Sequence, residues 1–472
     1  MTEIPFRGAL EVAAAIRDKR LSATQYLEYV LNRIEQHDPA LNSVITLNAD
    51  AALTAAHEAD QAVSDGAVLG PLHGVPFGLK DIIDAANLPT TAHSRIYANN
   101  IPIEDAAVTA HLKQSGAILV AKLATHEFAF GGPSFDLPWP PARNPWDTRM
   151  FTGGSSSGSG AAIAAGFMPL ALGTDTGGSV RNPASLCGIV GMKATYGRVS
   201  RRGVVPLAFS LDHVGPMTRT VSDNAALLQV ISGYDPRDRA SAQVPVPDYL
   251  SAVERGRTQG IKGMRIGVIR HFFEKDMVAD SKVVNAINAS LHVLADLGAH
   301  ITDVETQSLQ TFSNVNRIIL LSEAYAVHQH WLQSRPQDYA VMTREKLLPG
   351  AFIRALDYVQ ALRNRPLFTA AIDRLLDDAD VLITASSMDP PFPIDDPEAV
   401  AHCYPRSARP PFNLTGHPAL SLPIGFTEPD DDVPVLPLGL QVIGRHFDEA
   451  SIYRVASAYE QATNWSEVHP PH

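Results

Sequence analysis

The sequence predicts an α/β fold built on a large central sheet, because short β-rich segments alternate with amphipathic helical segments along the chain. Residues 22–25 read Ser-Ala-Thr-Gln, which matches a capping box, and apolar residues follow at helical spacing up to Asp38-Pro39. A helix is therefore expected there. A strand is expected at residues 43–47 and an alanine-rich helix from about residue 51 to 63.

The same alternation continues along the rest of the chain. Residues 75–83 are β-rich and end in a polar loop, residues 108–115 are helical in pattern, and residues 117–121 form a buried strand pattern. Helices are expected at 223–232 and 281–297, with a strand at 264–269 between them. Residues 316–378 are mostly helical in pattern, and a further strand is expected at 379–384.

The domain organisation follows from the absence of any break in this pattern. A length of 472 residues alone would suggest about three domains. The sequence contains no internal repeat, no low-complexity linker and no shift in composition. We therefore expect one domain over residues 1–472, with a variable, mostly helical, cap-like region around residues 312–368.

Composition excludes several classes of function. With 45% hydrophobic and 19% charged residues the chain can bury a large core, and its net charge of -12 disfavours nucleic acid as a partner. Residues 1–20 lack the apolar stretch of a signal peptide, and the apolar residues 161–172 are too few to span a membrane. Cys187 and Cys403 are too few for a disulfide framework or a thiolate zinc site. We expect a soluble, cytoplasmic protein without a cofactor or a metal.

Two stretches rich in glycine and serine, residues 152–160 and 173–181, stand out from this background. A flexible linker is a poor explanation for the first, because it runs directly into the helix-forming residues 161–165. A phosphate-binding loop is also poorly supported, since neither stretch has the lysine followed by Ser or Thr that the Walker pattern requires.

The second stretch has the features of a nucleophile loop. Gly177 and Gly178 permit backbone angles at which consecutive N–H groups converge beside Ser179, which is how an oxyanion hole is built. Serine needs a base, and none of the 17 histidines is marked out for that role by its context. Lys80 is a candidate, because an apolar β-rich context would lower its pKa. An ion pair between Lys80 and Asp81 at a strand end explains the local sequence equally well.

Taken together, these segments resemble the amidase signature family. The matching segments are 74–81, 144–147, 153–159, 173–179, 187–198, 210–219, 413–416 and 438–444, so the resemblance covers nearly the whole chain. It implies one large domain whose central, mixed and twisted β-sheet is covered by helices on both faces.

The resemblance also assigns roles to residues of this sequence. Ser179 matches the family nucleophile, Ser155 matches the relay serine that lies on a cis peptide bond in this family, and Lys80 matches the catalytic lysine. The interval of 24 residues between Ser155 and Ser179 agrees with the family pattern. The oxyanion hole is expected from the backbone N–H groups of Thr176, Gly177, Gly178 and Ser179, and supporting roles from Asp175, Arg181 and Ser156.

The expected activity is that of a serine amidohydrolase that cleaves C–N bonds of small amides through an acyl-enzyme. Aromatic and apolar residues near the expected pocket favour hydrophobic or aryl amides, although ordinary core packing explains any one of them equally well. Esters and carbamates are further candidate substrates, so arylamidase, esterase and urethanase activities are compatible with the site. The pocket residues proposed on this basis are Phe128, Phe130, Gly131 and Gly132, with Phe135, Trp139 and Phe412 as further aromatic neighbours.

One alternative function comes from the same family. In the tRNA-dependent amidotransferase, the glutamine-hydrolysing component, called its A subunit, works within a complex and shares the serine–serine–lysine set. Residues 323–328 and 406–411 do not present an obvious charged set for an amino-acid substrate, which disfavours this alternative. The sequence does not determine the oligomeric state, and a homo-oligomer is compatible with it.

Overall fold

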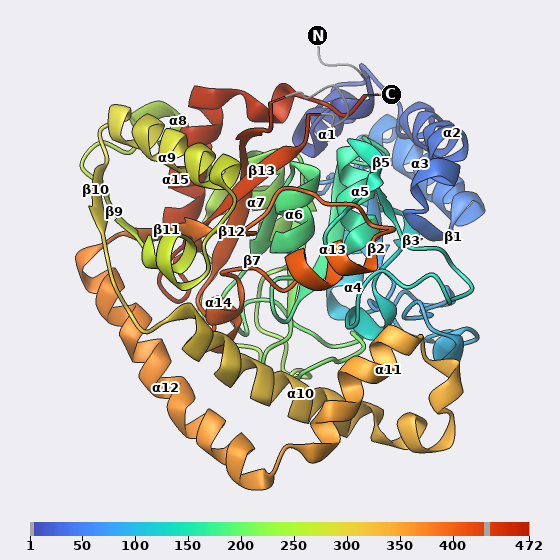
Figure 1. The fold of residues 1–472 in the computed structure, drawn as a ribbon. Helices are drawn as coiled ribbons and strands as arrows, with labels where there is room; N and C mark the ends of the chain where they lie inside the picture. The colour runs from blue at the N-terminus through green and yellow to red at the C-terminus, as the bar shows by residue number, and fades with distance from the viewer. Residues whose placement is uncertain (1–3, 429–434, 472) are drawn as a thin grey trace.

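A mixed sheet of 11 strands runs through the described part of the chain, and helices flank it (Figure 1). The computed structural model describes residues 4–428 and 435–471. The strand order is β1-β3-β2-β6-β8-β7-β12-β13-β11-β9-β10. The strands are β1 (Val44–Leu47), β2 (Pro76–Lys80), β3 (Ile118–Leu123), β6 (Leu170–Asp175), β7 (Val190–Lys193), β8 (His213–Thr218), β9 (Arg265–Val268), β10 (His300–Asp303), β11 (Val381–Ala385), β12 (Ala419–Phe426) and β13 (Pro437–Ile443). The expected α/β fold class, a single large domain around a mixed central sheet, is confirmed.

Strand directions explain why the sheet is mixed. β2 runs parallel to both of its neighbours, β3 and β6, and β9 runs parallel to β10 and β11. The pairs β1/β3, β6/β8, β7/β8, β7/β12, β12/β13 and β11/β13 are antiparallel. Every residue of β2, β3 and β6 is buried, so these central strands are covered on both faces. Polar side chains in them, Lys80 above all, are therefore out of contact with water.

The helices alternate with the strands as expected. They are α1 (Ala9–Arg17), α2 (Ala23–Leu41), α3 (Ala49–Ser64), α4 (Ala107–Gln114), α5 (Ser157–Ala164), α6 (Arg181–Cys187), α7 (Val221–Ile231), α8 (Tyr249–Gln259), α9 (Ser281–Asp296), α10 (Leu309–Ser334), α11 (Val341–Leu347), α12 (Ala355–Asp378), α13 (Pro397–Cys403), α14 (Pro410–Leu414) and α15 (Glu449–Thr463). A separate two-stranded ribbon consists of β4 (Arg143–Asn144) and β5 (Asp147–Phe151). None of the described helices has both the length and the apolar character that crossing a membrane requires.

The capping box at the start of α2 is present. Ser22 Oγ accepts from the Gln25 backbone N–H at 3.0 Å, and the Gln25 side chain accepts from the Ser22 N–H at 3.4 Å. The expected stop at Asp38-Pro39 is wrong by a few residues, because α2 includes Pro39 and continues to Leu41. The helix ends instead at Asn42, whose φ of 53° is left-handed and whose N–H donates to the Asp38 carbonyl.

Most of the other predicted elements are present with small shifts at their ends. The β-rich segment 75–83 contributes only β2 to the sheet, since the chain turns away after Lys80. The mostly helical stretch 316–378 contains α10, α11 and α12, which lie together along one border of the molecule in Figure 1. Whether these helices act as a cap stays a prediction.

Candidate active site

Lys80 is the last residue of β2, and its side chain is fully buried. Its Nζ lies 2.7 Å from the Oγ of Ser155 and 2.7 Å from the Oγ1 of Thr174 on the neighbouring strand β6. Ser155 lies in the glycine- and serine-rich segment between β5 and α5, and the Gly154–Ser155 peptide bond is cis. The structure thus brings together two of the three residues to which the resemblance assigns catalytic roles.

The backbone around Ser155 is held from three directions. The Gly154 N–H donates to Asn182 Oδ1 at 2.9 Å, and the Ser155 carbonyl accepts from the His126 N–H at 3.0 Å. The Ser156 N–H donates to the Ser179 carbonyl at 3.2 Å. This last bond joins the two glycine- and serine-rich segments, so Ser155 and Ser179 belong to one hydrogen-bonded unit.

The side chain of Ser156 fastens the same unit to β6. Its Oγ donates to the Thr174 carbonyl and accepts from the Thr174 N–H, both at 3.2 Å. Since Thr174 also accepts from Lys80, Ser156 connects the lysine strand to the serine segment. This geometry agrees with the supporting role that the resemblance gives to Ser156.

The loop that carries Ser179 is organised around the carboxylate of Asp175. This carboxylate accepts from the Gly178 N–H at 2.8 Å and from the Arg181 Nε and Nη2, both at 3.0 Å. Arg181 in turn donates to Asn413 Oδ1 at 2.6 Å and to Gln441 Oε1 at 2.8 Å. Asp175 and Arg181 are both fully buried, so the ion pair fixes the loop from inside.

Two residues of this loop remain accessible to solvent. Gly177 and Ser179 are half-buried, whereas the other residues from Thr174 to Arg181 are buried. Of the three residues with predicted catalytic roles, Ser179 is therefore the accessible one, whereas Lys80 and Ser155 are fully buried.

Burial changes the proton affinity of the lysine. Desolvation lowers the pKa of Lys80 to about 7, although the carboxylates of Asp175 and Asp212 act in the opposite direction. Burial would raise the pKa of Asp175, but the adjacent Arg181 guanidinium holds it well below its usual range. At neutral pH a large fraction of Lys80 is therefore an uncharged amine that can accept a proton.

The backbone N–H groups expected to form the oxyanion hole do not lie in equivalent surroundings. The Gly178 N–H donates to Asp175, so this group is committed to holding the loop. Gly178 has a φ of 124°, and a Cβ there would collide with the Arg409 side chain, whereas a Cβ at Gly177 would meet open space. The N–H groups of Thr176, Gly177 and Ser179 are the better candidates.

The residues predicted to line a substrate pocket lie in different surroundings. Phe128 is buried among the rings of Tyr97, His328, Trp331 and Tyr339, with centroid distances of 4.6 to 6.1 Å. Phe412 is also buried, whereas Phe130 is half-buried and Phe135 is exposed. For Phe128 and Phe412, the structure shows the core packing that the sequence left as an alternative.

The two glycines of the predicted pocket lie against α11. A Cβ on Gly131 would lie 2.7 Å from Thr343 Oγ1, and one on Gly132 would lie 2.5 Å from Met342 Sδ. Gly132 also borders a cavity of about 10 Å³, which has room for roughly one water molecule. These glycines allow close packing of the chain on α11, and their predicted role as pocket residues stays a prediction.

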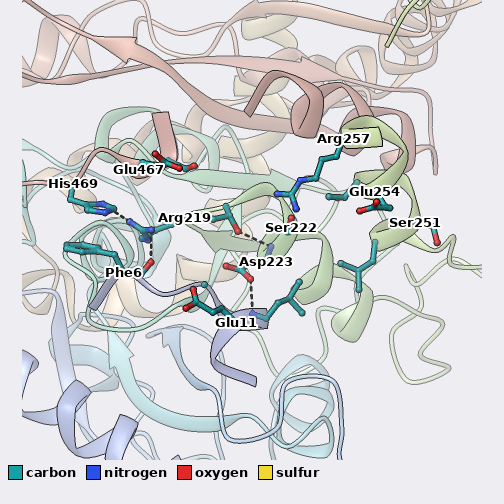
Figure 2. Close-up of a pocket in the computed structure, with 16 residues that line it drawn as sticks. Phe6, Glu11, Arg219, Ser222, Asp223, Ser251, Glu254, Arg257, Glu467 and His469 are labelled. Atoms are coloured by element: carbon teal, nitrogen blue, oxygen red, sulfur yellow. Dashed lines mark hydrogen bonds between the residues drawn. The ribbon is translucent and has the colours of Figure 1, made fainter. Parts of the chain in front are cut away.

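A much larger cavity, of about 1060 Å³, lies elsewhere in the molecule (Figure 2). Its walls come from the N-terminal segment, α7, α8 and the C-terminal segment. Arg219 lines it and donates to the Phe6 carbonyl and to His469 Nδ1, both at 2.8 Å. None of the residues with predicted catalytic roles lines it. The size of this cavity therefore gives no reason to place the chemistry there.

Several residues that hold the site were not predicted from the sequence. Thr174 is the second hydroxyl on Lys80, Asn182 accepts from Gly154, and Asn413 donates to Asp175. Thr174 and Asn413 lie inside segments that match the family, so the signal for them was present. Asn182 and His126 lie outside the matched segments, and only the folded structure reveals their contacts.

Fold and site together define a class of enzyme. A large mixed sheet carries a buried lysine–serine pair, and a second, accessible serine is hydrogen-bonded through its carbonyl to the residue after the first serine. Such a set suits hydrolysis of amide bonds. A family model described as Amidase matches residues 25–453, so the chain belongs to the amidase family, which is the amidase signature family. The resemblance drawn from the motifs is confirmed.

Individual relatives agree with this assignment. The A subunit of glutamyl-tRNA(Gln) amidotransferase from Chloroflexus aurantiacus is 38% identical over 100% of this chain and 99% of its own length. The solved structure of peptide amidase from Stenotrophomonas maltophilia matches with a TM-score of 0.85 and 29% identity, covering 100% of this chain and 99% of that chain. A bacterial aryl acylamidase matches with a TM-score of 0.86 and 25% identity, covering 98% and 97%. The expected class, an enzyme acting on amide C–N bonds, is confirmed.

Proposed function

We propose that the chain hydrolyses small amides through an acyl-enzyme on Ser179, with Ser155 as the proton relay and Lys80 as the base. The observation that carries this proposal is the 2.7 Å contact between Ser155 Oγ and a buried lysine whose pKa is lowered to about 7. Ser155 is joined to the accessible Ser179 through the Ser156 N–H. We propose that a proton passes from the Ser179 hydroxyl to the Ser155 hydroxyl and on to the buried amine.

The reaction begins when Ser179 Oγ attacks the substrate carbonyl and gives its proton to Ser155, which passes its own proton to neutral Lys80. The C–N bond breaks as the proton returns by the same path to the leaving nitrogen. Water then attacks the acyl-enzyme ester by the same route and restores Ser179. In the tetrahedral intermediate, we propose that the N–H groups of Thr176, Gly177 and Ser179 hold the oxyanion. Such donors are typically worth about 3–4 kcal/mol each.

The test of this proposal is labelling by a fluorophosphonate, which reports the nucleophile without requiring a known substrate. We expect one label per chain, located on Ser179 by peptide mass spectrometry, and no label in Ser179→Ala. Ser222→Ala, which removes a half-buried hydroxyl at the large cavity, is the matched control and should label at the normal rate. Unchanged labelling of Ser179→Ala would exclude Ser179 as the nucleophile.

For the substrate, we infer two alternatives, each supported by a different observation. A hydrolase that acts alone on hydrophobic amides, esters or carbamates is supported by the structural likeness to a peptide amidase and an aryl acylamidase. A role as the glutamine-hydrolysing component of an amidotransferase is supported by 38% identity over the whole chain, which exceeds the identity to either of those enzymes. The second alternative therefore has the stronger sequence support.

The purified chain by itself distinguishes the two. A panel of glutamine, a hydrophobic nitroanilide, an aryl ester and an aryl carbamate would be assayed with wild type and with Ser179→Ala as the blank. Rapid turnover of the anilide or carbamate, with glutamine untouched, supports the enzyme that acts alone. Turnover of glutamine alone, with the anilide, ester and carbamate hydrolysed slowly or not at all, supports the amidotransferase component. The partner chain of this protein would then be sought by co-purification.

A further inference from the structure

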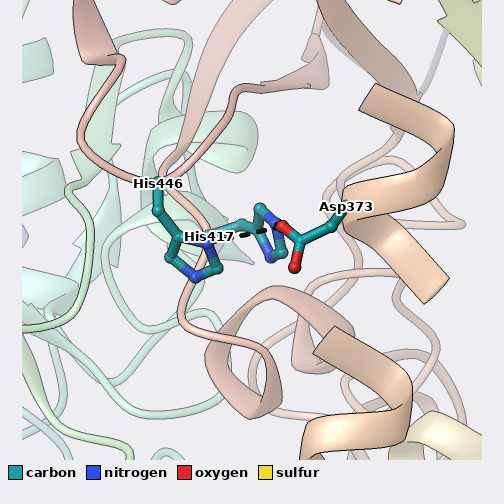
Figure 3. Close-up of side chains that lie close together, drawn as sticks. All are labelled: Asp373, His417 and His446. Carbon is teal, nitrogen blue, oxygen red and sulfur yellow. Dashed lines mark hydrogen bonds and ion pairs between the residues drawn. The ribbon is translucent and has the colours of Figure 1, made fainter. Parts of the chain in front are cut away.

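A cluster of two histidines and one aspartate lies beside the start of β12 and the end of β13 (Figure 3). Asp373 lies on α12, His417 lies between α14 and β12, and His446 lies between β13 and α15. Their ligand atoms all lie within 4.8 Å of one another. Figure 3 shows both rings beside the Asp373 carboxylate. Because the three residues are not close together in sequence, no spacing motif predicts the cluster.

The distances suit a metal ion. His417 Nε2 lies 3.0 Å and His446 Nδ1 lies 3.6 Å from the same atom, Asp373 Oδ1. Metal–ligand distances of about 2.0–2.2 Å place neighbouring ligand atoms about 3.0–3.5 Å apart in tetrahedral or octahedral geometry. The two distances to Asp373 Oδ1 therefore lie within or close to the range of a coordination site.

The hydrogen bonds of the two rings leave the right atoms facing the carboxylate. His446 Nε2 lies 3.0 Å from the Thr415 carbonyl oxygen, which can only accept, so Nε2 carries the hydrogen. With the hydrogen on Nε2, Nδ1 keeps a lone pair that can coordinate a metal ion, and it lies 3.6 Å from Asp373 Oδ1. A metal ion coordinated by His417 Nε2, His446 Nδ1 and the Asp373 carboxylate would join all three groups.

Thr415 supplies the outer partners that ligating histidines usually have. Its carbonyl accepts from His446, and its Oγ1 lies 2.9 Å from His417 Nδ1. Metal-bound histidines commonly donate their second ring N–H to such oxygens, which fixes the orientation of the ring. The His417 backbone is held as well, because its carbonyl accepts from the buried Lys193 at 2.5 Å.

The cluster is accessible from solvent on one side. The side chain of His417 is fully buried, whereas those of Asp373 and His446 are 51% and 31% exposed. An ion could enter over Asp373 and keep water in its remaining coordination positions. Two imidazoles with one carboxylate favour Zn²⁺, Ni²⁺ or Co²⁺ over Mg²⁺ or Ca²⁺, which prefer all-oxygen sites.

We propose that Asp373, His417 and His446 bind a divalent transition-metal ion that fastens α12 to the loops flanking β12 and β13. The sequence contains too few cysteines for a thiolate zinc site, which led to the expectation of no metal. This site has histidine and aspartate ligands only, so that expectation does not exclude it. The proposal is independent of the acyl-transfer chemistry, since none of its ligands takes part in the proposed relay.

The test is metal binding by the full chain without a histidine tag, stripped with a chelator and titrated with Zn²⁺ by calorimetry. We expect one Zn²⁺ per chain, and at least tenfold weaker binding in His446→Ala and in Asp373→Ala. Both side chains are partly exposed, so these variants should remain folded, which circular dichroism checks. His300→Ala, which removes an exposed histidine of β10 outside the cluster, should bind as wild type does.

Two further measurements separate a built site from general histidine affinity. Thr415→Val removes only the hydroxyl beside His417 and should weaken binding roughly tenfold, as the loss of an outer partner does. Zn²⁺ should raise the melting temperature of wild type and of His300→Ala but not that of His446→Ala. Absence of stoichiometric binding at about 10 µM Zn²⁺, or equal binding by wild type and Asp373→Ala, would overturn the proposal.

Discussion

The reactivity of Ser179 should follow the protonation state of Lys80, and the perturbation that reveals this is pH. The pKa of Lys80 is lowered to about 7 because β2 is buried along its whole length. Only the neutral amine accepts a proton, so acidification through pH 7 should remove the activity and alkaline pH should restore it. The rate at which Ser179 reacts should therefore decrease as the pH falls.

The magnitude follows from the titration curve. With a pKa of about 7, half of Lys80 is neutral at pH 7 and about 1% at pH 5. The second-order rate of fluorophosphonate labelling should therefore fall about 50-fold from pH 7 to pH 5 and rise only about twofold from pH 7 to pH 9. A lysine with the ordinary pKa of about 10.4 would instead give a tenfold rise per unit across pH 7–9.

The assay is the rate of labelling of Ser179 across pH 5–9 at constant ionic strength, corrected for spontaneous hydrolysis of the probe. Circular dichroism at each pH confirms that the fold persists. Lys80→Ala should label very slowly at every pH and without the step near pH 7. A rate that keeps rising tenfold per unit above pH 8, or an optimum in acid, would refute the role of a buried neutral lysine.

Three further predictions concern the residues that hold Lys80 and the loop of Ser179. Thr174→Val removes one of the two hydroxyls that accept from Lys80, and a hydrogen bond to a charged donor is worth about 1.5–3 kcal/mol. The midpoint of the labelling profile should therefore move about one to two pH units lower, and an unmoved midpoint contradicts this. Arg181→Met removes the ion-pair partner of the buried Asp175 and should lower the free energy of unfolding by about 3–5 kcal/mol, measured by urea denaturation. A loss below about 1 kcal/mol would show that the loop does not depend on this ion pair. Gly178→Ala should lower the free energy of unfolding by about 2–5 kcal/mol, because φ is positive at Gly178 and a Cβ there would collide with Arg409. Gly177→Ala, whose Cβ would meet open space, should lower it by less than about 1 kcal/mol. Equal losses for the two variants would contradict the geometry.

The sequence predicts the fold well where local physics decides it. The capping box at Ser22 and the apolar periods of the later helices depend on residues within one or two turns of each other, so their pattern is visible in the sequence. The predicted end of α2 is misplaced because proline ordinarily stops a helix. In the structure the helix runs through Pro39 to Leu41, and Asn42 supplies the left-handed cap.

The candidate site shows the same division between local and long-range information. Family motifs select Lys80, Ser155 and Ser179, but local sequence does not decide between a base and an ion pair for Lys80. The structure gives Asp81 a different partner, Lys122, at 2.9 Å, and leaves Lys80 with two hydroxyls. That outcome depends on which strand lies beside β2, which no local pattern specifies.

Among the sequence predictions, the pocket is the least reliable, because its residues are also surrounded by segments that are distant in sequence. Phe128 is a reasonable pocket residue by type, yet it packs against rings contributed by α10 and by Tyr339, which are 200 or more residues away in sequence. Gly131 and Gly132 likewise meet α11. The predicted catalytic residues lie in segments whose motifs are self-contained. We propose that the surroundings of the substrate depend instead on how the α10–α12 region meets residues 126–133. Substitutions in that contact, such as Gly132→Ala against Met342, should therefore change which substrate is preferred while leaving the pH dependence set by Lys80 unaltered.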